Sequence, residues 1–248
     1  MNLRTASCVA AVAAITSVLQ VNANPGVLFS DAIGDIDAGI STGGGTLDLV
    51  SMEVSHTATD IQFKLTVNGN ISSTDWGKFM VGIANNKGYG TSSSDGWARP
   101  ITMSANGGMT NWLGGWVDGG GGAENRSHEI FDRWGLTGAT YNGNFGTYGL
   151  VSGARTGDRS TITFGVSIAS LGMSIGDTFR FDAYSSGGGG SDSAIDALAN
   201  PNVAVTSWDQ AYNSGTSNSF SYTLAAIPAP GAIALVGLAG LVARRRKA

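Results

Sequence analysis

Aspartates at short spacing are the residues of this chain best suited to bind a metal ion. Asp31, Asp35 and Asp37 fall within seven residues of a glycine-containing loop, and Asp192 and Asp196 follow a run of four glycines. Calcium takes about six to eight oxygen ligands from the carboxylates and main-chain carbonyls of flexible loops. The pattern therefore predicts a structural calcium ion held by Asp31, Asp35 and Asp37. The alternative is that these aspartates only form turns and keep the surface soluble.

Tryptophans form a second candidate site, for carbohydrate. Three of the six, Trp97, Trp112 and Trp116, lie in one glycine-rich stretch, and the spacing of the last two puts them on one face of a regular strand. An aromatic ring stacks on the apolar face of a sugar while polar side chains bind its hydroxyls. The alternative is that the tryptophans fill a core. The predicted carbohydrate-binding residues are Trp97, Arg99, Asn111, Trp112, Trp116 and Asp118.

The sequence lacks the common catalytic motifs. His128, next to Glu129, has no second histidine at the spacing of the zinc-protease helix, and there is no G-x-S-x-G elbow or P-loop. His128 and His56 are expected at the surface or at a strand edge. We therefore predict a protein that is not an enzyme. A glycosidase is the alternative, because 18 acidic residues offer many carboxylate pairs.

The charge distribution excludes nucleic acid as a partner. The chain has 14 basic residues, but Arg4 and the cluster 244–247 supply five of them. The stretch between has nine basic against 18 acidic residues, a net charge of −9, which repels phosphates. The single cysteine, Cys8, lies in the N-terminal segment that we expect to be removed, so no disulfide is predicted.

The elements that must position these residues are strands. From Asp60 to Val67, apolar residues alternate with polar ones, which puts one row in a core and the other in water. Clusters of Gly, Asn, Asp and Ser separate this run from others with the same alternation. Those other runs are 50–54, 79–83, 162–168 and 179–183, and helical turns are expected only near 167–171 and 193–199.

This pattern predicts an all-β fold. About eight to ten strands without alternating helices favour a single antiparallel β-sandwich, jelly-roll or immunoglobulin-like, over residues 24–226. No repeat of 20 to 50 residues is visible, which argues against a β-helix. An N-terminal signal helix and a C-terminal transmembrane helix are expected to flank this domain.

The N-terminal segment, residues 1–23, is typical of a secretory signal peptide. It has a short basic start at Arg4, an apolar run from Ala6 to Leu19, and small residues at 21–23 that fit signal peptidase cleavage. We therefore expect the chain to be exported.

The C-terminal segment, residues 227–248, combines a proline pair, an apolar run and a basic end. The 20 residues from Leu224 to Ala243 are just long enough to cross a bilayer, with the basic cluster on the cytoplasmic side. The motif Pro228, Ala229, Pro230 followed by Arg244, Arg245 and Arg246 resembles the PEP-CTERM sorting tail of bacterial proteins. That resemblance implies transient anchoring in the inner membrane, processing by an exosortase-type enzyme, and delivery to the cell surface or extracellular matrix. Ala229 replaces the usual glutamate of the motif.

The order of short motifs within the domain carries a second resemblance. The motifs at 31–35, 97–100, 162–172, 176–181 and 194–198 occur in an order that resembles DOMON-like and family-9 carbohydrate-binding-module-like sandwiches. That resemblance implies a secreted module that binds sugars or, in some branches, haem.

These observations together predict an exported, non-catalytic carbohydrate-binding module with exopolysaccharide as its ligand. The alternatives are a structural envelope or matrix protein with no small ligand, and an extracellular glycoside hydrolase.

Overall fold

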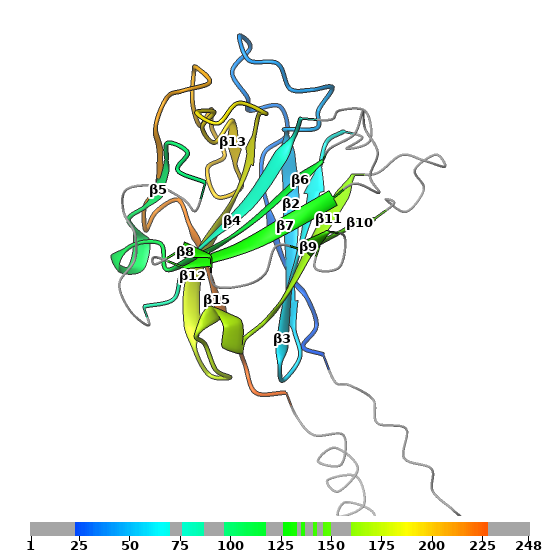
Figure 1. Ribbon diagram of the computed structural model, residues 1–248, viewed down its shortest axis with the longest axis vertical. Helices are drawn as coiled ribbons and strands as arrows, with labels where there is room; N and C mark the ends of the chain where they lie inside the picture. Colours follow the sequence, from blue (N-terminus) through cyan, green and yellow to red (C-terminus); the bar gives the residue numbers. More distant parts are fainter. Residues whose placement is uncertain are drawn as a thin grey trace, which may run out of the picture. The chain divides into compact units, whose positions relative to one another are not determined.

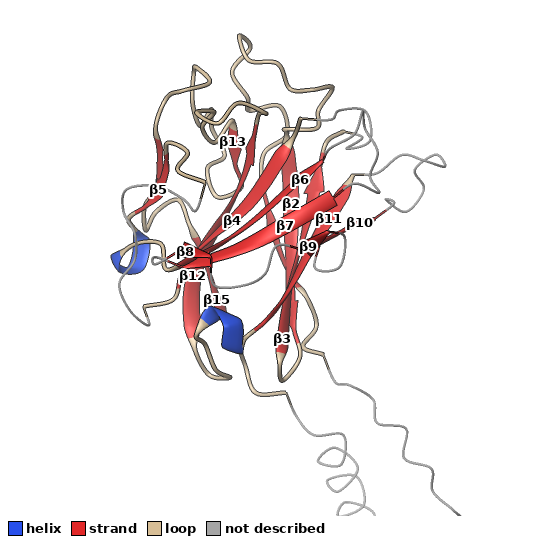
Figure 2. Cartoon of the chain, in the orientation of Figure 1, coloured by secondary structure: helices blue, strands red, loops and turns tan. Residues whose placement is uncertain are grey.

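The residues that the structure describes form strands joined by turns, with two single turns of 3-10 helix among them (Figures 1 and 2). The computed structural model describes residues 23–69, 76–86, 97–117, 126–132, 135–136, 141–142, 146–149 and 160–227, and within 116–117 and 126–149 the backbone path alone. Residues 23–227 form one compact unit. The predicted signal segment and sorting motif lie outside the described residues.

The strands and helical turns have the following bounds: β1 Val27–Ser30, β2 Leu49–His56, β3 Asp60–Val67, β4 Lys78–Ala84, β5 Ile101–Met103, η2 Ala105–Gly107, β6 Asn111–Val117, β7 Arg126–Asp132, β8 Gly135–Leu136, β9 Tyr141–Asn142, β10 Gly146–Gly149, β11 Thr161–Ser167, η3 Ala169–Leu171, β12 Thr178–Ser186, β13 Asp196–Ala197, β14 Tyr212–Ser214 and β15 Phe220–Thr223.

Two antiparallel sheets contain most of these strands. Sheet A has the order β1-β2-β3-β11-β10. Sheet B has the order β13-β12-β4-β6-β7-β8, with β15 paired to β12 and β9 paired to β7. Strands β5 and β14 form a separate parallel pair. The prediction of an all-β chain with antiparallel sheets is confirmed.

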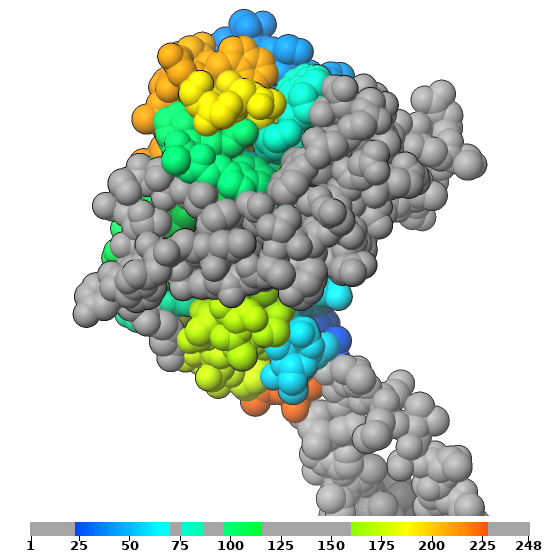
Figure 3. Space-filling model, in the orientation of Figure 1, coloured from blue at the N-terminus to red at the C-terminus, as the bar shows by residue number. Residues whose placement is uncertain are grey.

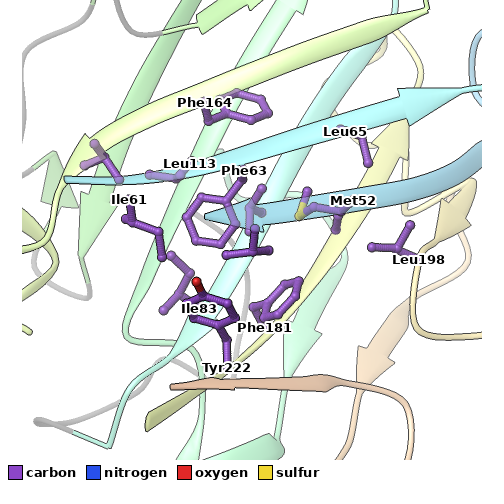
Figure 4. Close-up of a cluster of buried hydrophobic side chains, with 14 of the residues drawn as sticks. Met52, Ile61, Phe63, Leu65, Ile83, Leu113, Phe164, Phe181, Leu198 and Tyr222 are labelled. Carbon is purple, nitrogen blue, oxygen red and sulfur yellow. The ribbon is translucent and has the colours of Figure 1, made fainter. Parts of the chain in front are cut away.

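A first core cluster fills the space between the inner faces of the two sheets (Figure 4). Phe63 of sheet A contacts Phe179 and Phe181 of sheet B edge to face, with ring centroids 6.2 and 5.9 Å apart. Such pairs add to the hydrophobic effect of burying the rings. This two-layer packing is the arrangement of a β-sandwich.

The alternating runs become strands of sheet A almost as predicted. β3 has the predicted bounds, and its four apolar residues are buried while its polar residues face outward. β2 departs from simple alternation, because a bulge lies between Leu49 and Ser51 in its pairing with β3. Val50 is therefore only half-buried, while Met52 and Val54 return to the core.

Strands β4 and β12 of sheet B are buried on both faces. In β4, Phe79, Val81 and Ile83 belong to the first core cluster, while Met80 and Ala84 belong to a second one on the opposite face. We use "outer layer" for the segments that cover this opposite face: residues 31–48, 97–110 and 187–215. The second core cluster consists of Ile36, Ile40, Leu47, Met80, Ala84, Ile101, Met103, Ala105, Met109, Trp112, Tyr184, Ala194, Ile195, Ala197, Val205 and Tyr212.

His56 joins both ends of the compact unit. Its carbonyl oxygen accepts a hydrogen bond from the backbone N–H of Asn24 (2.8 Å), and its Nε2 donates to the carbonyl oxygen of Ala225 (2.9 Å). Its Nδ1 then accepts from the hydroxyl of Tyr222 (2.7 Å). The expected position at a strand end is found, but the side chain is buried rather than at the surface.

Asp182 of β12 is buried under the outer layer in a complete set of hydrogen bonds. Its Oδ1 accepts from the backbone N–H groups of Ala183 (2.8 Å) and Ala199 (3.0 Å), and its Oδ2 is 2.6 Å from Ser214 Oγ. Burial raises the pKa of the Asp182 carboxyl to about 7, although these hydrogen bonds act in the opposite direction.

We expect Phe63→Ala to lower the free energy of unfolding by about 3–5 kcal/mol, because it leaves a cavity between the two sheets. Denaturant unfolding followed by tryptophan fluorescence measures this change. Gln62→Ala is the matched control on the exposed face of the same strand and should change the free energy by less than about 0.5 kcal/mol. Equal effects of the two substitutions would contradict the two-sheet packing.

We expect Asp182→Asn to change how stability depends on pH. The carboxyl ionises near 3.8 when unfolded and near 7 when folded, so its neutral form stabilises the fold fully below about pH 4 and this contribution is lost as the pH rises through about 7. Asparagine keeps an oxygen for the two N–H donors and offers an N–H to Ser214. The difference in unfolding free energy between variant and wild type should therefore grow from about pH 4 to about pH 8. Urea denaturation across this range measures it, and a difference independent of pH would refute it.

Candidate functional site

Three aspartates meet at one end of the molecule. Carboxylate oxygens of Asp31, Asp35 and Asp196 all lie within 4.8 Å of one another. Asp31 and Asp35 come from the segment after β1, and Asp196 from β13, an edge strand of sheet B. The blue segment that follows β1 and the yellow to orange segments around β13 gather at this end in Figures 1 and 3. The cluster therefore joins parts of the chain that belong to different sheets.

Main-chain N–H groups fix two of the three carboxylates. Oδ2 of Asp196 accepts from the N–H of Leu49, the first residue of β2, and its Oδ1 accepts from the N–H of Ala197, both at 2.7 Å. Asp31 Oδ1 accepts from the N–H of Ala32 at 2.8 Å. Asp196 is thus held against sheet A although its own strand belongs to sheet B.

A fourth aspartate, Asp48, supports the turn that contains Asp35. Its two carboxylate oxygens accept from the N–H of Gly34 at 3.2 and 3.1 Å. Its Oδ2 also accepts from Asn68 Nδ2 at 2.9 Å. Gly45 allows this approach, because its φ is +88° and a Cβ there would lie 2.3 Å from the carbonyl oxygen of Asn68. Asp48 is therefore satisfied by donors from two segments.

The cluster lacks the donors that its carboxylates need. Oδ2 of Asp31 and both oxygens of Asp35 are buried from solvent and accept no hydrogen bond. Burial raises the pKa of Asp31 to about 9, with the Asp196 carboxylate as the second cause. Burial is also the main cause that raises the pKa of Asp196 to about 8 and the pKa of Asp35. Each carboxylate is costly to ionise here without a positive charge nearby.

A divalent cation would supply the positive charge that the cluster lacks. Calcium is bound by oxygens at about 2.3–2.6 Å, so two oxygens on opposite sides of the ion are at most about 5 Å apart. The three carboxylates fall within that span. Their irregular loop suits calcium, which tolerates variable geometry, better than magnesium, which demands near-ideal octahedral geometry. Main-chain carbonyls and water would have to complete the ligand set.

The structure brings together two of the three predicted metal ligands, Asp31 and Asp35, with Asp196 as the third. Asp37 is not part of this group. Its Oδ1 accepts from the N–H of Gly39 at 2.8 Å, which is the turn-forming role left open as the alternative. Asp192 likewise closes its own glycine loop by accepting from the N–H of Gly189 at 2.8 Å. Sequence spacing could not show that Asp196 returns to the loop after β1.

Several residues of the predicted carbohydrate set are buried rather than on the surface. Trp112 is 2% exposed and Asn111 is 6% exposed. Arg99 is 4% exposed, and its Nη1 donates to Ser186 Oγ at 2.7 Å and to the carbonyl oxygen of Asp192 at 3.0 Å. Their burial favours the alternative that these side chains pack in the interior of the domain.

Trp97 is the half-buried member of the predicted set. Its ring meets Trp112 edge to face at 4.5 Å, and the Arg99 guanidinium lies 5.7 Å from its centre. Gly114 permits this packing, because a Cβ there would come within 2.6 Å of the Trp97 ring. The side chains of Trp116 and Asp118 lie outside the described part of the chain, so carbohydrate binding through the full set stays a prediction.

A second tryptophan pair was not anticipated. Trp76 and Trp208 are half-buried and meet edge to face with centroids 6.3 Å apart. The glycine run between β12 and β13 permits this contact: a Cβ at Gly187 would lie 2.7 Å from Trp208 and one at Gly188 would lie 3.1 Å from Trp76. No local signal could have paired these two residues, because they lie far apart in the sequence.

The other predicted residues fall outside what the structure describes. His128 lies in β7, but its side chain is not described, and neither are Pro228, Ala229, Pro230 and Arg244, Arg245, Arg246. Within the described residues, no helix is long and apolar enough to cross a membrane.

Comparison of the chain with protein-family models, with curated proteins and with solved structures gives no match. The geometry of the site and the pattern of the sequence are therefore the basis for a functional proposal.

Proposed function

We propose that this chain is an exported, non-catalytic protein of the cell surface or extracellular matrix, with a β-sandwich that binds calcium at Asp31, Asp35 and Asp196. The observation that carries the proposal is the set of buried carboxylate oxygens of Asp31 and Asp35 that accept no hydrogen bond. A buried carboxylate without donors is destabilising unless a cation pairs with it.

The role of the calcium ion would be structural. It would cross-link the segment after β1 to β13, in a domain that has no cysteine to form a disulfide there. Ligand binding to the folded state alone raises the free energy of unfolding by about 2.7 kcal/mol at 100 times the dissociation constant. A cation at this site would therefore contribute a large share of the net stability of a domain this size.

The same cluster fits a glycoside hydrolase poorly. Retaining enzymes hold their two carboxyl groups about 5–5.5 Å apart and inverting enzymes about 6.5–9.5 Å apart, around an open sugar site. Here the carboxylate oxygens are within 4.8 Å of one another, and those of Asp35 are buried. This geometry supports a cation between the carboxylates rather than a substrate.

The sequence supports the route by which the protein would reach its location. Signal peptidase would remove residues 1–23, and an exosortase-type enzyme would process the tail 227–248 at the inner membrane. A jelly-roll or immunoglobulin-like sandwich would then act outside the cell, and its acidic surface argues against nucleic acid as a ligand.

Carbohydrate binding is the second part of the proposal. Three members of the predicted set could still contact an exopolysaccharide. They are the half-buried Trp97, and Trp116 and Asp118, whose side chains lie outside the described part of the chain. The alternative, a structural matrix protein without a small ligand, is favoured by the burial of Trp112, Asn111 and Arg99.

We expect Asp35→Asn to abolish stabilisation by calcium. Wild type should gain about 5–10 °C in melting temperature with saturating calcium, from the free energy above and about 2–4 °C per kcal/mol for a domain of this size. Asp35→Asn should show no gain. In chelator at about pH 10, above the pKa of about 9 of the neighbouring Asp31, the variant should melt above wild type, because it removes a carboxylate whose oxygens accept no hydrogen bond. Differential scanning calorimetry with calcium and with EGTA measures both effects.

Asp37→Asn is the matched control, because asparagine can still accept from the N–H of Gly39. It should respond to calcium as wild type does. If calcium leaves the melting temperature of wild type unchanged and isothermal titration calorimetry shows no binding heat, the proposed site is wrong.

We expect Trp97→Ala to reduce retention on a glycan array at least about tenfold, because it removes the stacking ring of the predicted set. Trp208→Ala is the control: it is also half-buried against the second core cluster but lies outside the predicted set. Retention lost only in Trp208→Ala would move the sugar site to the Trp76–Trp208 pair. If the wild-type protein binds no glycan, carbohydrate binding is wrong and a structural role in the matrix is the alternative that stands.

A further inference from the structure

Residues 32–40 cover part of the second core cluster without forming a helix or strand. Ile36 and Ile40, at 9% and 5% exposure, are buried in that cluster. The turn around them is held by short-range bonds, from the N–H of Ile40 to the carbonyl oxygen of Asp37 (2.9 Å) and from Gly39 to the Asp37 side chain. The segment is therefore a cover that has little structure of its own.

Few direct contacts of a polar kind attach this cover to sheet B beneath it. In the part of the chain that the structure describes, no hydrogen bond joins residues 32–40 to β12 or β13. The polar groups that face each other across this contact are the carboxylates of Asp35 and Asp196. The cover is tied at its base instead, through the N–H of Gly34 and the Asp48 carboxylate.

The two sides of the carboxylate cluster differ in how firmly they are held. Asp196 accepts from Leu49 and Ala197, so its position is fixed by both sheets. Asp31 stands at the end of β1, where its N–H donates to the carbonyl oxygen of Val50 at 3.0 Å. The Asp35 carboxylate oxygens accept no such bond, and Asp35 belongs to the cover itself.

We propose that the cation at Asp31, Asp35 and Asp196 closes residues 32–40 over the second core cluster, so that this cover is ordered only when the cation is bound. The inference rests on the proposed calcium site and adds its consequence for the fold. With the cation, the ionised Asp35 is attracted to the fixed side of the cluster. Without it, the ionised carboxylates repel one another at short range in a buried setting, and the cover opens.

Opening would change the surface as well as the segment. Ile36 and Ile40 would leave the second core cluster, and the apolar side chains beneath them would meet water. Ile33, already 61% exposed, lies on the same segment. The protein would then expose an apolar patch where divalent cations are scarce and bury it where they are abundant.

Hydrogen–deuterium exchange followed by mass spectrometry tests the proposal on the full domain. The measurement is made with calcium and with EGTA, both at about pH 10, above the pKa of about 9 of Asp31 and of about 8 of Asp196, so that protons do not replace the cation. Peptides that cover 32–40 should exchange at least about tenfold faster in EGTA. Peptides of β3 should keep the same protection in both conditions, which separates local opening from global unfolding.

Two variants sharpen this experiment. Asp35→Asn removes the repulsion, so its 32–40 peptides should exchange at one rate with and without calcium. Asp37→Asn should behave as wild type, because its residue lies on the same cover but outside the cluster. ANS fluorescence of wild type should rise in EGTA and not in calcium, as the apolar patch becomes accessible.

The outcomes separate the two proposals. If calorimetry shows calcium binding and the 32–40 peptides exchange equally in both conditions, the closure is wrong while the calcium site stands. If calorimetry shows no calcium binding, both proposals fail together. Faster exchange of the 32–40 peptides in EGTA, lost in Asp35→Asn and kept in Asp37→Asn, supports the closure.

Discussion

The burial of β4 and β12 of sheet B on both faces is the constraint on which the rest of the domain depends. Six of the seven residues of β4 and seven of the nine residues of β12 are buried, so neither face of these strands can meet water. Sheet A covers one face with regular strands. The other face is covered by turns and short strands. These pair fewer of their own main-chain N–H and C=O groups with one another than the long strands of a sheet do. Side chains must therefore satisfy the polar groups that the outer layer buries.

That requirement is met at some positions and not at others. Ser186 and the carbonyl oxygen of Asp192 receive the guanidinium of Arg99, and Ser214 pairs with Asp182. In contrast, Oδ2 of Asp31 and both oxygens of Asp35 lie close to Asp196 and accept no hydrogen bond. Three such oxygens in one cluster are informative, because unpaired buried polar atoms are rare unless a ligand pairs with them. The missing partner is the reason to assign a cation there.

Sheet A was predictable from the sequence, whereas the outer layer was not. The alternation that places Phe63 in the core and Gln62 outside is a local signal, and β3 follows it to the residue. The run 79–83 in β4 gives the same signal for one face only: Phe79, Val81 and Ile83 lie in the first core cluster, but the residues between them are buried as well, because a strand covered on both faces is apolar throughout. The same reason hides Trp112 in a core where a surface was expected. Sequence spacing predicted Asp37 as a metal ligand. Asp196 lies in the cluster instead, and its place there depends on the pairing of β13 with β12, which is not visible in the sequence.

The contacts of His56 have a consequence for the connectivity of the fold. One residue binds Asn24 through its carbonyl oxygen and Ala225 through its ring, so the two ends of the compact unit meet at the same strand end. A chain whose ends are this close can be joined there by a short linker and cut in an exposed turn elsewhere without changing a strand pairing. The order in which the strands are linked is thus separable from the contacts that stabilise them.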